Sequence, residues 1–305
     1  MSLAAAPVKA FFALSRGTQA SLSVAQPLTA ALLAADHPPP VRLAAATVAA
    51  FAGFFAAFAV NDVLDVDLDR RRFAHVRPYE GADLDGVGGR HPLALGRVSR
   101  RAALTYIATL GLVALVVTAL LGWVCVALFA VAACLQVLYC RLATVTSVKF
   151  LVSGVMVAVG AAVGWFTVST AVDAPRLGLL LVWMAAWEIG GRNIPNDLAD
   201  LDEDRHLGVR TLPVVHGPRT AAAVACGFLL LAGAASCALA WVALRSFGTV
   251  GLAGTLLVAA VTSVGPALAL LRRPRPPVAL AVFNRASLQP VGVLAAFAAG
   301  LATGG

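Results

Sequence analysis

Charged residues are scarce in this chain of 305 residues, at 12% of the total, about half the share of an average soluble domain. Lysine occurs only at positions 9 and 149, so arginine supplies almost all of the positive charge. No two cysteines form a C-x-x-C pair, which argues against a thiolate metal site or a dithiol redox centre. We expect the cysteines to be small buried apolar residues: Cys125, Cys134, Cys140, Cys226 and Cys237. No compact apolar core with a small-residue cleavage site opens the chain, so no cleavable signal peptide is expected.

Long uncharged stretches account for the low charge. Hydrophobic residues make up 60% of the chain, and the mean hydropathy is +0.87. A helix needs about 20 apolar residues to cross a bilayer, and nine stretches approach or exceed that length. They are residues 16–35, 41–60, 102–121, 123–140, 147–170, 176–195, 220–244, 248–271 and 278–302. The sequence therefore predicts an all-α membrane protein of about nine transmembrane helices, with residues 1–305 forming one membrane domain.

The arginines indicate how this bundle is oriented. With nine helices, the N-terminus and the loops after helices 2, 4, 6 and 8 share one side, and most arginines fall there. The other side has little beyond Arg42, Arg176 and Arg245. The positive-inside rule makes the arginine-rich side cytoplasmic. The net charge of +8 is then a topology signal that also suits anionic membrane lipid, and nucleic acid is not an expected partner. Because arginine, alanine and glycine are typical of GC-rich bacterial genomes, we expect a bacterial inner-membrane protein.

An internal repeat places nine of the fifteen carboxylates in two clusters. Each cluster follows an apolar helix on the predicted cytoplasmic side, reads N-D-x-x-D-x-x-x-D, and lies 135 residues from the other. At 3.6 residues per turn, the repeated positions share one helical face, whereas Asp67 and Asp202 point elsewhere. The repeated positions are Asn61, Asp62, Asp65 and Asp69 in the first cluster and Asn196, Asp197, Asp200 and Asp204 in the second.

A row of carboxylates on one face repels itself unless a cation neutralises it. Oxygen ligands of this kind suit Mg²⁺, which is commonly held by one or two carboxylates together with substrate phosphate oxygens. Two such faces opposed across a cavity can therefore hold a diphosphate and promote cleavage of its C–O bond. The flanking arginines can bind further phosphate oxygens, and we predict this role for Arg72, Arg77 and Arg205. The alternative is a solvated acidic helix end, which two matched clusters on one membrane side make less attractive.

These motifs resemble those of the UbiA superfamily of intramembrane prenyltransferases. Further matches are the segment from His91 to Ser99, which is similar to the family's R-P-L-x-x-G-x-x-S, and Gly208, Thr211, Leu212 and Pro213 after the second motif. The resemblance implies a helical bundle around a central cavity that opens to the bilayer, cytoplasmic cap loops, and two Mg²⁺ ions on the motifs. It also implies ionisation of a prenyl diphosphate by Asp65, Asp69, Asp200 and Asp204.

Two departures from the family pattern fall in the cap. His91 stands where the family commonly has arginine, although Arg90 is adjacent. The segment between Asp69 and His91 is longer than usual and contains Glu80, Asp83 and Asp85. Both departures leave the diphosphate chemistry intact and leave the identity of the substrate open.

Further residues are candidates for binding the substrate. Phe54 and Phe58 belong to a stripe on the second helix that runs into the first acidic motif, where they can contact a prenyl chain and stabilise an allylic cation; ordinary packing is the other interpretation. The resemblance suggests that Tyr139 and Lys149 contact the diphosphate, and the alternative is an interfacial anchor and a topology marker. Asn193 shares the face of the second motif.

Three other residues near the second motif are open to interpretation. Glu188 and Arg192 are four residues apart in an apolar helix, so an intrahelical ion pair is the simplest interpretation of both. Pro195 is expected to kink this helix and to release backbone groups near the site.

Three functions fit these features to different degrees. The first is transfer of a prenyl group to an acceptor, with an aromatic or quinone-precursor ring as the commonest acceptor in the family. The second is a terpene cyclase on the same bundle, which performs the same ionisation without an acceptor. The third is a cation-binding transporter, which fits less well because transport sites usually lie near the membrane midplane.

Overall fold

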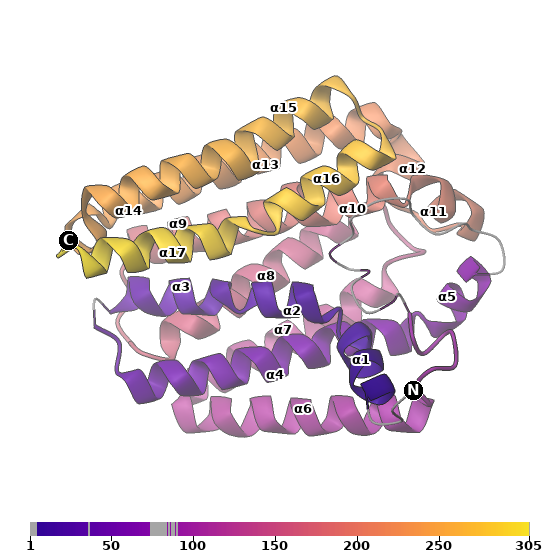
Figure 1. Ribbon diagram of the computed structural model, residues 1–305, viewed down its shortest axis with the longest axis horizontal. Coiled ribbons are helices and arrows are strands. Elements are labelled where there is room, and N and C mark those ends of the chain that lie inside the picture. The colour runs from indigo at the N-terminus through magenta and orange to yellow at the C-terminus, as the bar shows by residue number, and fades with distance from the viewer. Residues whose placement is uncertain are drawn as a thin grey trace.

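The structure is a computed structural model that describes residues 5–35, 37–73, 84, 86, 89 and 91–304. Every regular element in those residues is a helix (Figure 1). The elements are α1 (Ala5–Leu14), α2 (Gly17–Ser23), α3 (Ala25–Ala34), α4 (Pro40–Leu64), α5 (Val66–Phe73), α6 (Arg100–Leu121), α7 (Trp123–Arg141), α8 (Lys149–Phe166), α9 (Ala174–Trp187), η1 (Glu188–Asn193), α10 (Ile194–Ala199), α11 (Leu201–Leu207), α12 (Leu212–His216), α13 (Pro218–Val242), α14 (Leu244–Ala259), η2 (Ala260–Val264), α15 (Gly265–Arg272), α16 (Pro276–Ala286) and α17 (Gln289–Ala302).

Seven helices in the described part of the chain are long and apolar enough to cross a membrane. They are α4, α6, α7, α8, α13, the helix of residues 244–272 and the helix of residues 276–302. The prediction of an all-α membrane protein is confirmed. The other two predicted spans are assembled from shorter helices: α2 and α3 meet at Val24, and α9 continues through η1 into α10. The count of nine crossings therefore stays a prediction.

The long helices lie side by side, and the two ends of the bundle differ (Figure 1). The short helices α5, α11 and α12 gather at one end, on the right of Figure 1, and the C-terminus lies at the other. Both acidic motifs are at the end with the short helices, because each motif spans the end of a longer helical segment and the start of α5 or α11. The two acidic motifs, 135 residues apart in the sequence, thus lie at the same end of the bundle.

Small residues let the backbones approach closely inside the bundle, as is common between membrane helices. Gly164 of α8 illustrates this, since a Cβ atom there would overlap the backbone of Pro27 in α3. Gly160, one turn earlier on the same helix, has open space where a Cβ atom would lie. The close contact between α3 and α8 therefore depends on Gly164 and not on Gly160.

We expect Gly164→Ala to destabilise the protein by about 1–3 kcal/mol, the usual result of overpacking a tight contact. Thermal unfolding of the purified protein in detergent would show this as a lower midpoint. Gly160→Ala is the matched control, and its midpoint should stay the same or rise slightly, because alanine favours the helix over glycine. Equal losses for both variants would contradict the close α3–α8 approach.

Candidate active site

The two acidic motifs have the same backbone geometry, and both bend at their central aspartate. Asp65 separates α4 from α5 with φ −95° and ψ 4°, and Asp200 separates α10 from α11 with φ −93° and ψ 14°. Backbone hydrogen bonds continue across each bend: Asp65 N to Asn61 O is 2.9 Å, and Asp200 N to Asn196 O is 3.0 Å. Each motif is therefore two helical segments joined at a bend, and not one regular helix.

Despite the bends, all eight predicted metal ligands line a single cavity of about 120 Å³. They are Asn61, Asp62, Asp65, Asp69, Asn196, Asp197, Asp200 and Asp204. Two intervening carboxylates are at the surface: the side chains of Asp67 and Asp202 are 84% and 85% exposed. A third, Glu203, is buried and does not line the cavity. The spacing within each motif thus distinguishes Asp67 and Asp202 from the carboxylates of the cavity.

Lys149 and Tyr139, which the family resemblance suggested as contacts of the diphosphate, also line this cavity. Lys149 begins α8, and its Nζ lies 3.2 Å from Asp197 Oδ1 and 5.1 Å from the centre of the Tyr139 ring. The Tyr139 hydroxyl accepts a 2.8 Å hydrogen bond from Asn193 Nδ2. Lys149 therefore supplies a buried positive charge to a cavity lined by six carboxylates.

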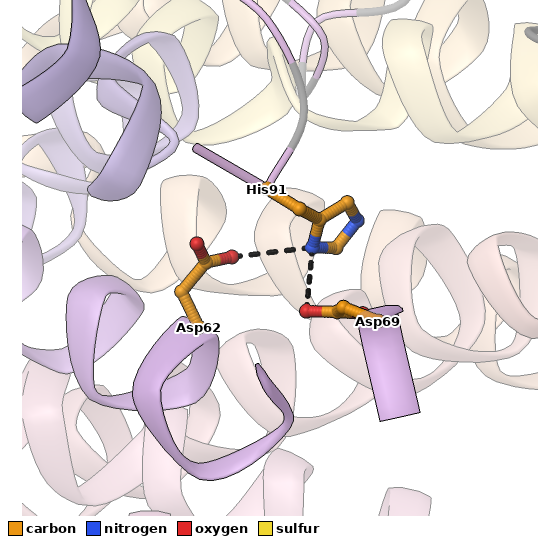
Figure 2. Close-up of side chains that lie close together, drawn as sticks. All are labelled: Asp62, Asp69 and His91. Atoms are coloured by element: carbon orange, nitrogen blue, oxygen red, sulfur yellow. Dashed lines mark ion pairs between the residues drawn. The ribbon is translucent and has the colours of Figure 1, made fainter. Parts of the chain in front are cut away.

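His91 contacts two aspartates of the first motif, Asp62 and Asp69, as Figure 2 shows. Its Nδ1 lies 2.7 Å from Asp69 Oδ2 and 3.2 Å from Asp62 Oδ1. Burial lowers the pKa of His91, but the hydrogen bonds to Asp62 and Asp69 outweigh it, so the pKa is raised above its ordinary value. His91 is held at φ 49°, a left-handed conformation uncommon for histidine. The departure from the family's arginine therefore places an imidazole directly on two of the predicted ligands.

Two more residues of the cavity were not recognised from the sequence. Arg16 lines it from the junction of α1 and α2, where its φ is 44°, and Cys140 lines it from the end of α7. The Cys140 thiol donates a hydrogen bond to Asn61. A lone arginine at the start of the first predicted span, residues 16–35, was the available signal for Arg16, whereas Cys140 was interpreted only as a small apolar residue.

Of the arginines predicted to bind phosphate, one lies away from the cavity and two cannot be placed among the described residues. Arg205 is half exposed, and its Nη1 lies 3.5 Å from Asp202 Oδ1, on the outer face of α11. Arg77 and the Arg72 side chain lie outside the described residues, as do the acidic residues of the long segment, Glu80, Asp83 and Asp85. The roles assigned to these residues stay predictions.

A second, apolar cavity of about 450 Å³ adjoins the acidic one. Phe54 and Phe58 lie on its wall, as predicted, and it extends to Leu121 and Thr167 near the opposite end of the bundle. The two cavities share four lining residues: Arg16, Asn61, Tyr139 and Asn196. A molecule with an anionic head and a long apolar tail can therefore occupy both cavities at once.

The segment before the second motif is widened at the predicted kink. The π-helix η1 ends immediately before Ile194 and Pro195, where α10 begins. A π-turn accommodates a residue that cannot donate a backbone hydrogen bond, and such turns are frequent at functional sites. The structure therefore has a π-helical segment directly before Pro195, while the kink and the released backbone groups stay predictions.

The residues of the acidic cavity fit a hard divalent cation. Each of the eight repeated asparagine and aspartate side chains offers an oxygen, and Asp62 Oδ2 is buried without a hydrogen-bond partner among the described residues. Burying a carboxylate oxygen without a partner costs folding free energy unless a cation or a hydrogen-bond donor reaches it. Oxygen ligands in this number suit Mg²⁺.

The structure thus defines a membrane-embedded helical bundle with an internal, acid-lined site at one end. The chain belongs to the UbiA prenyltransferase family, whose sequence profile matches residues 23–288. A curated relative from Natronomonas pharaonis, named digeranylgeranylglyceryl phosphate synthase, is 33% identical over 199 residues, which are 63% of this chain and 64% of that protein. The match thus covers just under two thirds of the relative's length.

Solved structures of UbiA homologues have the same fold. One from Aeropyrum pernix K1 has a TM-score of 0.69 and 20% identity, with 91% of this chain and 96% of that chain covered. Another from Archaeoglobus fulgidus, bound to DMAPP and Mg²⁺, has a TM-score of 0.62 and 15% identity, with 94% and 99% covered.

Proposed function

We propose that this protein is a Mg²⁺-dependent intramembrane prenyltransferase, acting as one membrane unit on a prenyl diphosphate and a lipophilic acceptor. The observation that supports this most strongly is the junction of the two cavities. Carboxylates from two motifs 135 residues apart meet in one polar chamber, and that chamber opens into an apolar chamber of about 450 Å³. A diphosphate fits the first with its metal ions, and a prenyl chain fits the second.

The two motifs would hold two Mg²⁺ ions, one for each group of carboxylates. Bound Mg²⁺ polarises the phosphate oxygens of the leaving group. Lys149, which lies beside Asp197, and Tyr139 bind the diphosphate from the wall of the same cavity. Phe54 and Phe58 flank the start of the chain and face positive charge that develops at the allylic carbon.

The acceptor could belong to one of two chemical classes, an aromatic ring or a lipid alcohol. The family resemblance favours an aromatic or quinone-precursor ring. The curated relatives are named for synthesis of a glyceryl phosphate lipid, which makes a lipid alcohol the second class. A cyclase without an acceptor is the third possibility, and charged side chains in the apolar cavity, described below, favour a polar acceptor over it.

The distribution of arginine supports an orientation with the acidic cavity toward the cytoplasm. We propose a bacterial inner membrane as the location on the composition alone. Labelling of single cysteines introduced at Asp202 and at Trp123, from either side of sealed vesicles, would test this orientation, since both side chains are exposed.

Release of diphosphate by the protein in lipid nanodiscs tests the function. We expect Mg²⁺-dependent release from one member of a panel of prenyl diphosphates, faster with an acceptor than without, and none after chelation of Mg²⁺. Release that yields a cyclic hydrocarbon without an acceptor would identify a cyclase. Absence of Mg²⁺-dependent release with every donor, with and without a membrane lipid extract, would refute the prenyl diphosphate reaction.

A further inference from the structure

A pair of charged residues lies in the wall of the apolar cavity, away from the carboxylates. Glu188 and Arg192 both belong to η1, and their side chains are only 10% and 9% exposed. Arg192 Nη1 is 3.5 Å from Glu188 Oε2, so the ion pair expected from the sequence is present. Ser153 of α8 donates a 2.6 Å hydrogen bond to Glu188 Oε1 and also lines the cavity.

A buried ion pair is seldom the most stable way to fill the space between helices. Apolar side chains of similar volume usually stabilise a buried site as well as an ion pair does, or better. Ionisable groups within a membrane protein are costly and tend to mark a functional site. The π-helical geometry of η1 is a second indication of a functional site, because it moves these two side chains away from the positions they would have in a regular α-helix.

The guanidinium of Arg192 has unused hydrogen-bonding capacity. It lies over three aromatic rings, with distances to the ring centres of 5.8 Å for Phe58, 5.3 Å for Trp187 and 5.8 Å for Phe283. Its Nε is buried without a hydrogen-bond partner among the described residues. The 3.5 Å separation from Glu188 is also longer than the 2.7–2.9 Å typical of a close charge-assisted hydrogen bond. Arg192 therefore has an N–H donor without a partner among the described residues, and it lies close to the carboxylate of Glu188.

A hydroxyl group matches that arrangement. It accepts one hydrogen bond and donates another, so it can bridge an arginine N–H and a carboxylate oxygen. Because Glu188 and Arg192 together carry no net charge, they favour a neutral polar group over an anion, which would require an excess of positive charge. Asn196, which borders both cavities, is one turn from Arg192, about 6 Å along the helix. The pair thus lies beside the point where a diphosphate's first carbons would enter the apolar cavity.

We propose that Glu188, Arg192 and Ser153 form the acceptor subsite and that they select an alcohol or phenol as the nucleophile. This inference rests on the proposed prenyl transfer. The acceptor oxygen forms a bond to the allylic carbon while the bond from that carbon to the diphosphate oxygen breaks, and the electrons of that bond leave with diphosphate. The hydroxyl proton passes to the Glu188 carboxylate and is released to water after the product leaves. Arg192 orients the acceptor oxygen, and Ser153 positions Glu188.

Two variants separate this role from a structural one. Glu188→Gln keeps the shape and can still accept from Ser153, but it is a far weaker proton acceptor. The double variant Glu188→Leu with Arg192→Met removes both charges together, which avoids leaving one buried charge unpaired. The probe acceptors are a single-chain alkylglycerol, which has two free hydroxyls, and its fully O-methylated counterpart, which has none. Asp202→Asn, exposed on α11, is the control variant.

We expect the wild-type protein to prenylate the alkylglycerol and not its O-methylated counterpart. In both site variants, kcat/KM for the alkylglycerol should fall about 100-fold, within the range for loss of a general base, while slow release of diphosphate to water stays within about threefold of wild type. Equilibrium binding of labelled alkylglycerol, measured without donor, should weaken in the double variant. An equal loss of transfer and of release to water, or wild-type transfer in either variant, would overturn the subsite. If the wild type itself released no diphosphate, the proposed prenyl transfer would fail instead.

Discussion

Asp69→Asn and Asp204→Asn should each lower Mg²⁺-dependent release of diphosphate by two to three orders of magnitude. The two aspartates occupy the same position in the two motifs, and both are buried in the acidic cavity. Each substitution removes one negative oxygen from a set that acts on the leaving group, and loss of one preorganised electrostatic group commonly costs about 10²–10³ in rate. Initial rates at saturating donor, measured across a Mg²⁺ titration, would show the loss together with weaker dependence on the metal.

Unfolding temperatures measured with and without Mg²⁺ distinguish this loss of rate from misfolding of the variants. Carboxylates crowded into one cavity repel one another without a cation, so Asp204→Asn should unfold at or above the wild-type temperature when Mg²⁺ is absent. Asp69→Asn also removes the partner of His91, so its unfolding temperature without Mg²⁺ should be lower than that of Asp204→Asn. Adding Mg²⁺ should stabilise the wild type more than either variant, because a ligand that binds only the folded state raises its apparent stability. Asp67→Asn and Asp202→Asn remove exposed carboxylates from the same motifs and should keep wild-type rates. A similar loss in those controls would show that overall charge matters rather than the cavity.

The sequence was sufficient to predict which carboxylates meet, because helical periodicity survives a local bend. Spacing alone placed Asp67 and Asp202 off the shared face of the motifs, and both are exposed. The bends at Asp65 and Asp200 could not be predicted, since neither proline nor glycine occurs at those positions. Backbone hydrogen bonds across each bend keep the motif close to helical, which explains why a regular helix was a good approximation for the side chains.

Residues that reach the site from irregular backbone were harder to identify. Arg16 and His91 both have positive φ values, and no sequence pattern requires a non-glycine residue to adopt that conformation. Their direction therefore depends on tertiary contacts that spacing does not record. Glu188 and Arg192 present a different case: the four-residue spacing predicted their pairing, but only the cavity shows that the pair faces an open apolar space.

Lys149→Met is expected to lower kcat/KM for the prenyl diphosphate by two to three orders of magnitude, chiefly through a higher KM. Lys149 Nζ lies in the cavity 3.2 Å from Asp197, where it can also reach a bound diphosphate. Removal of one partner from a buried pair of charges typically costs about 2–5 kcal/mol of binding free energy. Steady-state kinetics with donor titrated at saturating Mg²⁺ would separate the change in KM from the change in kcat.

Two further variants show whether position or charge alone is responsible. Arg141→Gln removes an exposed positive charge from the end of α7, close in sequence to Lys149, and should leave KM within about twofold, since an exposed charge is screened by solvent. Lys149→Arg keeps the charge but replaces a compact ammonium with a larger planar group, so we expect a partial loss. If Lys149→Met raised KM no more than Arg141→Gln did, Lys149 would serve only to neutralise Asp197, and the diphosphate would have to be bound by the motifs and Arg16.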